Sequence, residues 1–294
     1  MFKDIKQVMK DSVLYGIGNV AVKLVGFILI PLYTDAEYFS TADYGLMGLL
    51  EVTSQILIAV MGLSLYSGLI RWYWDAEFRD KQKSVFFTTL LFTILTSLGV
   101  GGLLWLNVDG LSTLLIQQEG YSIGEELPYI LQLLILTSML GAVVEVPQNL
   151  LRLQSKPIYY SATNIVRLFV TLILTIYFTI SLHRGVAGVY EAQFFGIIIQ
   201  LFMVLPLIIK NSSLRIDKRC TIQLLSYSYP LVFPAIVGSL LTVFDRYIIN
   251  HFQGLEDVGF YSLGYKVGNT LKVFVVTSVQ LALTPLLMKK MNDP

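Results

Sequence analysis

Charged residues are scarce in this sequence, and histidine and cysteine are scarcer still. Only 14% of the 294 residues are Asp, Glu, Lys or Arg, against about 25% in soluble proteins, whereas 55% are hydrophobic. The formal net charge is +1, so no overall electrostatic field would gather nucleic acid, and we expect no nucleic-acid partner. The lone cysteine, Cys220, cannot form an internal disulfide, which excludes a disulfide-stabilised scaffold.

The sequence also has little that would serve catalysis or cofactor binding. It contains no phosphate-binding loop of the Gly-x4-Gly-Lys-Ser/Thr type, so we expect no ATPase site. Residues 16–21 (GIGNVA) resemble a dinucleotide fingerprint, but they lie inside an apolar segment with no preceding strand. His183 and His251 have no Cys or carboxylate at ligand spacing. We therefore expect no metal, no cofactor and no enzyme activity.

Long apolar segments are what the sequence has in abundance. A helix needs roughly 20 mostly apolar residues to cross a bilayer core about 30 Å thick, because no water there satisfies backbone groups. We predict an all-α, polytopic membrane helix bundle with about eight transmembrane helices. The predicted helices are residues 12–33, 44–70, 84–106, 128–151, 158–182, 186–209, 223–250 and 259–287. The longest connection, 107–127, has no Lys or Arg and is expected to be a solvated loop.

Basic residues are distributed unevenly among the predicted connections. Of the 21 Lys and Arg residues, 15 lie at the termini and in alternate connections: Lys3, Lys6, Lys10, Arg71, Arg79, Lys81, Lys83, Arg152, Lys156, Lys210, Arg215, Lys218, Arg219, Lys289 and Lys290. The other connections hold one basic residue, Arg184, and are rich in Asp and Glu. Because basic loops stay on the cytoplasmic side during insertion, we predict a multi-pass protein of the cell (inner or plasma) membrane with both termini cytoplasmic. Tyr33 and Tyr247, near the opposite face, suit an interfacial aromatic belt.

An internal repeat links the two ends of the chain. A shift of 214 residues, without a gap, places Ser12 on Ser226, Tyr33 on Tyr247 and residues 43–49 on 257–263, so that both copies begin a helix with Asp-x-Gly. Six helices separate the copies, an even number, so the repeat would be parallel. We predict an N-terminal six-helix lobe at 1–220 and a partial C-terminal lobe of two helices at 221–294, apparently truncated or completed by another polypeptide. Chance similarity among apolar helices is the alternative.

Ionisable residues inside the predicted helices are the candidate functional groups. A charge at the bilayer centre costs about 2.5–3.5 kcal/mol and normally faces a cavity or a partner. We expect Lys23 and Lys266, together with Arg167, to line a cationic pocket that receives a pyrophosphate group. We expect Asn269, on the same helix face as Lys266, and Glu51, on another helix, to face this pocket as well. The alternative is internal ion pairing, such as Lys23 with Glu51, that holds the bundle together.

Two further features concern conformational change. Pro230 and Pro234, in the predicted helix 223–250, remove intrahelical hydrogen bonds and favour kinks that could act as hinges, although static membrane helices also contain proline. Asp245 and Arg246 lie near the outer end of the same helix. They could gate the pathway or anchor the helix at the interface, and the sequence leaves both interpretations open.

Two stretches of the chain carry a family resemblance. The first is residues 26–33 (GFILIPLY) followed by 43–45 (DYG), and the second comprises residues 229–234 (YPLVFP), 245–249 (DRYII) and 258–267 (VGFYSLGYKV). They resemble the polysaccharide biosynthesis and export proteins, including O-antigen flippases, of the multidrug/oligosaccharidyl-lipid/polysaccharide exporter superfamily. Such proteins typically have twelve or more helices in two lobes, so four or more would be missing here.

The resemblance implies a function and partners. Members of this family flip undecaprenyl-pyrophosphate-linked oligosaccharides to the outer leaflet by alternating access, with helices one, two, seven and eight facing a central cavity. The implied partners are the lipid-linked oligosaccharide, membrane lipids, and polysaccharide polymerase or glycosyltransferase machinery. A cation-coupled multidrug exporter of the same superfamily is the alternative, and intramembrane acids such as Glu51 would then dominate. A second alternative is an inactive truncated remnant. A membrane-embedded glycosyltransferase is disfavoured, because such an enzyme usually needs a large extramembrane loop with acid or base residues, and loop 107–127 offers only three Glu residues.

Overall fold

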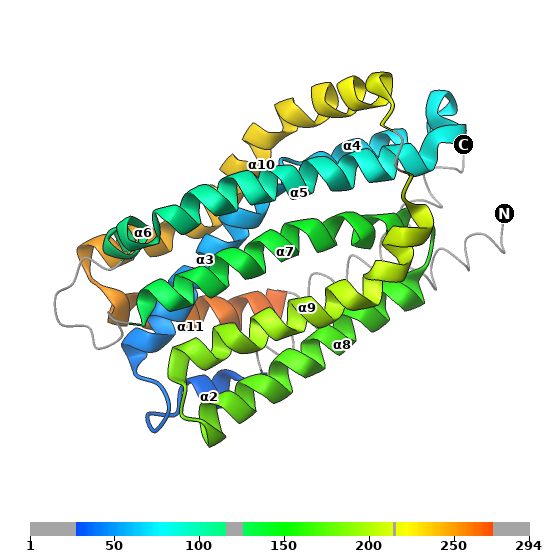
Figure 1. Cartoon of the computed structure of the whole chain (residues 1–294). Helices are drawn as coiled ribbons and strands as arrows, with labels where there is room; N and C mark the ends of the chain where they lie inside the picture. Colours follow the sequence, from blue (N-terminus) through cyan, green and yellow to red (C-terminus); the bar gives the residue numbers. More distant parts are fainter. Residues whose placement is uncertain (1–27, 116–125, 214–215, 273–294) are drawn as a thin grey trace, which may run out of the picture.

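A computed structural model describes residues 28–115, 126–213 and 216–272, and every regular element in these ranges is helical (Figure 1). The long helices are α3 (Thr41–Gly62), α5 (Gln82–Leu106), α7 (Leu127–Leu153), α8 (Pro157–Ile176), α9 (Gly185–Asn211), α10 (Lys218–Phe252) and α11 (Leu255–Lys272). The short ones are α2 (Ile30–Tyr33), α4 (Leu65–Trp72), α6 (Val108–Leu115), the 3-10 helix η1 (Ala76–Lys81) and the π-helix η2 (Tyr177–Ser181).

The helical membrane fold predicted from the sequence is confirmed. Within the described ranges, six helical segments are long and apolar enough to cross a bilayer, and they correspond to the second through the seventh predicted helices. The first predicted helix, 12–33, reaches the described residues only through its last part, and Lys23 lies outside them. The eighth, 259–287, is represented by α11 up to Lys272.

Two details of the sequence prediction were wrong. The predicted helix 44–70 is divided into α3 and α4, because Leu63 and Ser64 adopt left-handed backbone conformations with φ of 43° and 52°. A right-handed helix cannot continue through such residues. The connection 107–127 is not wholly irregular, since α6 begins it and places Val108 and Leu111 against the main hydrophobic core.

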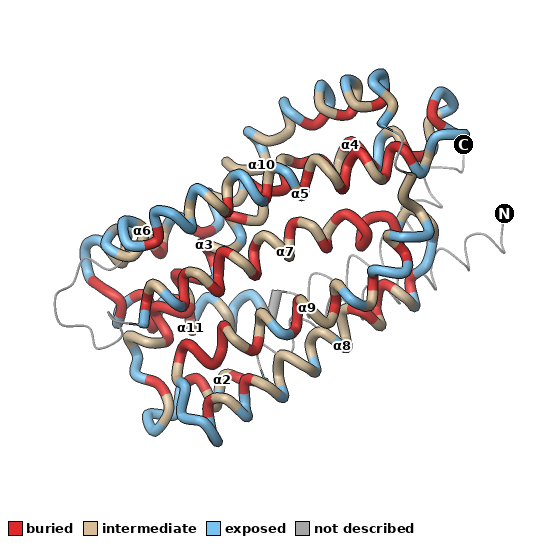
Figure 2. The backbone as a smooth tube through the Cα atoms, viewed as in Figure 1, coloured by how far each residue is buried: buried red, intermediate tan, exposed pale blue. Residues whose placement is uncertain are grey.

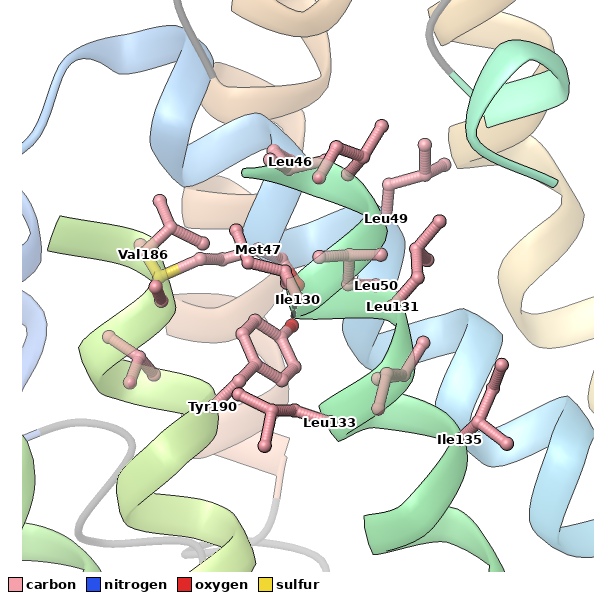
Figure 3. Packing of buried hydrophobic residues seen from close by; sticks show 14 of the residues in the cluster. Leu46, Met47, Leu49, Leu50, Ile130, Leu131, Leu133, Ile135, Val186 and Tyr190 are labelled. Atoms are coloured by element: carbon pink, nitrogen blue, oxygen red, sulfur yellow. Dashed lines mark hydrogen bonds between the residues drawn. The ribbon is translucent and has the colours of Figure 1, made fainter. Parts of the chain in front are cut away.

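The main core forms where α3, α7 and α9 pack together. Leu46, Leu50 and Ile130 are fully buried there, and Tyr190 projects from α9 between the other two helices (Figure 3). Figure 2 shows that the buried positions lie along the facing sides of these helices. Because lipid tails are as apolar as leucine, close packing rather than escape from water stabilises such a core.

Helix α10 is embedded much less deeply than the helices of the main core. In its most apolar stretch only 11% of the residues are buried inside the described protein, against 56% for α3 and for α7. Its side chains Phe233 and Leu241 are 75% and 81% exposed. Most of the surface of α10 is therefore available to lipid or to a partner.

Helices α3 and α11 approach each other through small residues of the repeated motif. Gly45 and Gly259 are equivalent positions of the repeat, and a Cβ atom on them would lie 1.9 Å and 2.4 Å, respectively, from a backbone carbonyl oxygen of the other helix. Gly48 and its equivalent, Ser262, also meet, since a Cβ atom at Gly48 would lie 2.3 Å from the Ser262 hydroxyl. Contact between equivalent positions is what a two-fold relation produces, and it supports the parallel repeat. The lobe boundary at residue 220 stays a prediction.

The basic connections meet at one end of the bundle, which we call the basic end and define as residues 73–83, 152–157, 210–213 and 216–219. Lys81 Nζ lies 2.5 Å from Asp217 Oδ2. Gln154 Nε2 donates to the hydroxyl of Tyr73 and to Oδ1 of Asn211, both at 2.9 Å. At the opposite, acidic end the connections around residues 34–40 and 182–184 are joined by stacking of Tyr38 on His183. The alternation of basic connections along the chain therefore corresponds to two ends in space.

Asp217 makes two kinds of contact at the basic end, and they can be separated by mutation. Its Oδ1 accepts hydrogen bonds from the first backbone N–H groups of α10, at Arg219 (3.0 Å) and Cys220 (3.1 Å), while Oδ2 accepts from Lys81. We expect Asp217→Asn, which keeps the helix cap but loses the ion pair, to be less thermostable than the wild type. Asp217→Ala, which loses both, should be less stable again in a melting experiment on detergent-purified protein.

The pH dependence of this contact has a definite sign. The hydrogen bond from Lys81, followed by that from Cys220 N–H, lowers the pKa of Asp217. A lowered pKa in the folded state means that the contribution is fully present above the unfolded pKa of about 3.9 and is lost as the pH falls through the folded value. The difference in melting temperature between wild type and Asp217→Asn should therefore stay constant from roughly pH 5 to 8. A difference that shrinks with acidification inside that interval would contradict the assignment.

Candidate functional site

The cations predicted on α10 and α11 lie against tyrosine rings at the junction of these helices with α2 and α3. The ammonium group of Lys266 lies 5.6 Å from the ring centroid of Tyr33 and 5.8 Å from that of Tyr44. The two rings are themselves 6.2 Å apart and tilted by 51°. A cation over an aromatic face is attracted by the ring quadrupole, more strongly where water is excluded. The aromatic faces therefore help to hold the charge of Lys266 at this junction.

Arg246 is the second cation of the junction and is only 8% exposed. Its guanidinium carbon lies 4.7 Å from the ring centroid of Tyr265 on α11. Its Nε has no hydrogen-bond partner among the described residues. A buried donor left unpaired costs free energy, and an anionic acceptor would satisfy it. We refer to Lys266, Arg246, Tyr33, Tyr44 and Tyr265 as the cation–tyrosine cluster.

Asp245 connects α10 to α11 beside this cluster. Its Oδ1 accepts the backbone N–H of Arg246 at 2.9 Å, and its Oδ2 accepts a hydrogen bond from the Tyr261 hydroxyl. The pair Asp245 and Arg246 therefore contacts α11 in this structure. These contacts would have to change if α10 moved relative to α11, and a role in gating stays a prediction.

Glu51 lies on α3 near the cluster. Its side chain is exposed, and it lies within electrostatic range of the hydroxyls of Tyr33, Tyr44 and Tyr190. Glu51 makes no ion pair within 4 Å to a described basic residue. Two cations and two carboxylates thus belong to this region, and of the carboxylates Asp245 already accepts hydrogen bonds on both oxygens.

A cavity of about 410 Å³ opens between α3, α4, α7 and α10. Its polar lining residues are Gln55, Ser64, Tyr66, Glu145, Ser239 and Thr242. Gln55 lies one helical turn from Glu51 on α3, so the face of α3 that carries Glu51 continues into the cavity. Pro234 and Gly238 of α10 also line it. The cavity therefore lies on the basic-end side of the cation–tyrosine cluster, because α3 runs from the acidic end at Thr41 to Gly62.

Other predicted site residues lie elsewhere. Arg167, on α8, donates from Nη1 to Gln200 Oε1 at 3.1 Å, and Gln200 Nε2 donates to Asn164 Oδ1 at 3.0 Å. This network joins α8 to α9, and α8 makes no extensive contact with α11. The structure therefore does not bring Arg167 together with Lys266. Asn269 is exposed on α11, near the end of the described residues.

The tyrosines of the cluster were not predicted as site residues. The sequence favours an interfacial belt for Tyr33, but this side chain is only 8% exposed and packs edge-on against Phe39. The sequence favours the same place for Tyr247, whose hydroxyl lies 2.7 Å from the Thr53 hydroxyl. One sequence feature indicates an aromatic surface here: Tyr261 and Tyr265 are four residues apart and therefore share a face of α11.

The prolines predicted to act as hinges lie within continuous helix. Pro230 and Pro234 are both inside α10, which runs from Lys218 to Phe252 without interruption. Pro234 lines the cavity, whereas Pro230 does not. A bend at this pair would change the shape of the cavity, so the hinge stays a prediction with a specific location.

Comparisons with known proteins identify the family and the fold of the chain. Residues 8–291 match the family described as polysaccharide biosynthesis protein, which confirms the resemblance seen in the sequence. Among solved structures, the chain is similar to a complex of the MATE multidrug transporter DinF-BH, with a TM-score of 0.75, 16% identity, and coverage of 95% of this chain and 64% of that one. It is also similar to a MOP superfamily transporter from Pyrococcus furiosus, with a TM-score of 0.69, 15% identity, and coverage of 94% and 63%.

A third solved structure, MATE in complex with MaL6, has a TM-score of 0.72 and 15% identity, and the alignment covers 96% of this chain and 64% of that one. At such identities the similarity establishes the fold. The chain spans 63–64% of the length of these three structures. No curated protein matches the sequence.

Proposed function

Since the chain belongs to the polysaccharide biosynthesis protein family, we propose that it translocates a lipid-linked oligosaccharide or polysaccharide precursor across the cell membrane by alternating access. It has the fold of MOP superfamily transporters. The cargo, the direction of movement and the cytoplasmic placement of the basic end belong to the proposal.

The observation that carries the proposal is the unpartnered Nε of buried Arg246, close to a second cation. Tyr44 connects the two, because Lys266 lies over its ring and Arg246 is within electrostatic range of its hydroxyl. A diphosphate linker carries at least two negative charges that lose water when they enter the membrane. Charge-assisted hydrogen bonds from a guanidinium and an ammonium would replace that water. The tyrosines add apolar faces with polar tips, which suit sugar rings.

The helix contacts suggest how access would alternate. The α3–α11 glycine contact closes the acidic end, while the 410 Å³ cavity lies on the basic-end side. With the basic end placed in the cytoplasm, as proposed, this arrangement would be the state open toward the cytoplasm. Export would require α11 to move away from α3 while the basic end closes, with α10 bending near Pro234.

The proposal is tested by translocation in proteoliposomes that contain the protein and a labelled undecaprenyl-pyrophosphate-linked oligosaccharide. We expect the labelled sugar to reach the opposite leaflet only in vesicles that contain the protein, where an impermeant lectin or oxidant detects it. A host that lacks its own flippase should also be rescued. Sugar that stays in its original leaflet, together with no rescue, would contradict the proposal.

A second candidate, a cation-coupled multidrug exporter, is favoured by one observation. Glu145 lines the cavity, and it makes no ion pair within 4 Å to a basic residue of the described ranges. An intramembrane carboxylate facing a cavity is a usual site for proton or cation coupling. In an exporter, Glu145→Gln and Glu51→Gln should abolish drug efflux while Lys266→Met leaves it unchanged. In a flippase we expect the opposite order for translocation of the lipid-linked sugar, and measuring both substrates on the same variants separates the two functions.

A further inference from the structure

A second cavity, of about 580 Å³, lies at the basic end of the bundle. It is formed where α5 begins, α7 ends, α8 begins and α9 ends, and these helix ends converge at the right of Figure 1. It shares no lining residue with the cavity between α3 and α10. We propose that this basic-end cavity binds the phosphate of an anionic lipid headgroup at the membrane surface, apart from the path of the cargo.

The charge of the cavity matches an anion. Lys83 and Lys156 both line it, and none of its lining residues is acidic. Of the four acidic residues of the same end, Asp75 pairs with Arg71 at 3.6 Å, Asp217 pairs with Lys81, and Glu77 accepts a hydrogen bond from Gln223. Among the described residues, no carboxylate, that of Asp80 included, lies within 4 Å of the ammonium group of Lys83 or Lys156. The two ammonium groups are therefore not neutralised by these neighbours.

The cavity wall is fixed by hydrogen bonds that join three connections. The amide nitrogen of Gln154 donates hydrogen bonds to Tyr73 and Asn211. Its amide oxygen accepts a hydrogen bond from Lys156 Nζ at 2.6 Å. Gln82 Nε2 adds a bond to the Tyr73 carbonyl at 3.0 Å. One of the three N–H donors of the Lys156 ammonium group thus bonds to Gln154, and the other two remain for a ligand. A wall ordered in advance lowers the entropy cost of binding.

The position of the cavity at the level of the lipid headgroups favours a lipid over a soluble ligand. Trp74 lines it, is 59% exposed, and donates from its indole nitrogen to the Leu153 carbonyl at 3.3 Å. Exposed tryptophan at the end of a membrane helix lies at the level of the headgroups. Lysines at that level are attracted to the anionic lipids of the cytoplasmic leaflet.

The binding is tested by tryptophan fluorescence in vesicles. The sequence has three tryptophans, so Trp72→Phe with Trp105→Phe leaves Trp74 as the sole fluorophore. We expect brominated phosphatidylglycerol to quench Trp74 more strongly than brominated phosphatidylcholine. Each lysine near an anionic surface strengthens association by about fivefold, so Lys83→Ala with Lys156→Ala should remove most of this preference.

The matched control is Lys210→Ala, which removes one exposed positive charge of the basic end that does not line the cavity. It should leave the preference almost unchanged. Inorganic pyrophosphate, added to the same vesicles, identifies the source of the phosphate. No release of the quenching supports the lipid headgroup, whereas release would overturn the lipid assignment and point to a soluble phosphate. The proposal is overturned if the lysine pair has no effect on the preference, or if Lys210→Ala abolishes it equally.

Discussion

Replacing Lys266 with methionine should lower the translocation of a lipid-linked sugar by about tenfold to a hundredfold while the protein stays folded. A hydrogen bond to a charged group contributes about 1.5–3 kcal/mol, and methionine removes it while keeping an unbranched apolar chain against Tyr33 and Tyr44. The initial rate in proteoliposomes is the quantity to measure. Elution as a single species with an unchanged melting temperature would show that the loss concerns recognition of the cargo.

Two variants serve as controls for this prediction. Lys210→Met removes a positive charge from the exposed end of α9 and should keep the wild-type rate. Arg246→Lys keeps the charge of its position but loses the planar fork that stacks on Tyr265, so we expect an intermediate rate. A Lys266→Met protein that transports at the wild-type rate would contradict a role for this lysine in binding the diphosphate.

Replacing Gly45 with alanine should be the most destabilising small substitution in α3. The added methyl group would lie 1.9 Å from the backbone carbonyl of Leu255, a distance that only a shift of α11 can relieve. Overpacking of this kind typically costs about 1–3 kcal/mol, and alanine recovers no more than about 1 kcal/mol through its higher helix propensity. We expect a lower melting temperature in detergent, and a similar loss for Gly259→Ala at the equivalent position.

Gly99→Ala on α5 is the matched control. Gly99 is exposed, and no described atom would lie within 4 Å of its new Cβ. The substitution should leave the melting temperature unchanged or raise it slightly. Equal stability of Gly45→Ala and Gly99→Ala would show that α3 and α11 do not pack through the repeated glycines.

The sequence predicted the membrane helices well because one physical requirement determines each of them. An apolar run must be long enough to cross the bilayer, so the predicted helix 128–151 corresponds closely to α7, Leu127–Leu153. The break after α3 could not be predicted in this way. Leu63 and Ser64 are left-handed at a point where Ser64 donates to the Leu231 carbonyl at 3.3 Å and Gly68 of α4 packs against Ser228 of α10. Such contacts join residues more than 150 positions apart.

The candidate site was predicted in part. The cost of burying charge identified Lys266, Arg246 and Glu51 as residues that need a cavity or a partner, but it could not say which partner. Tyrosine faces fulfil that role for both cations, and they come from three different helices. Arg167 satisfied the same sequence criterion and bonds to Gln200 instead. Lys23 lies outside the described residues, so its place in the pocket stays a prediction.

The most direct measurement of the central claim compares the binding of undecaprenyl pyrophosphate with that of undecaprenol, which has the same chain and no phosphate. Binding to the purified protein can be followed by calorimetry in detergent. We predict that the diphosphate binds at least tenfold more tightly than the alcohol and that Lys266→Met removes most of this difference. Equal affinity for both compounds, or a difference that survives in Lys266→Met, would contradict recognition of a diphosphate by the cation–tyrosine cluster.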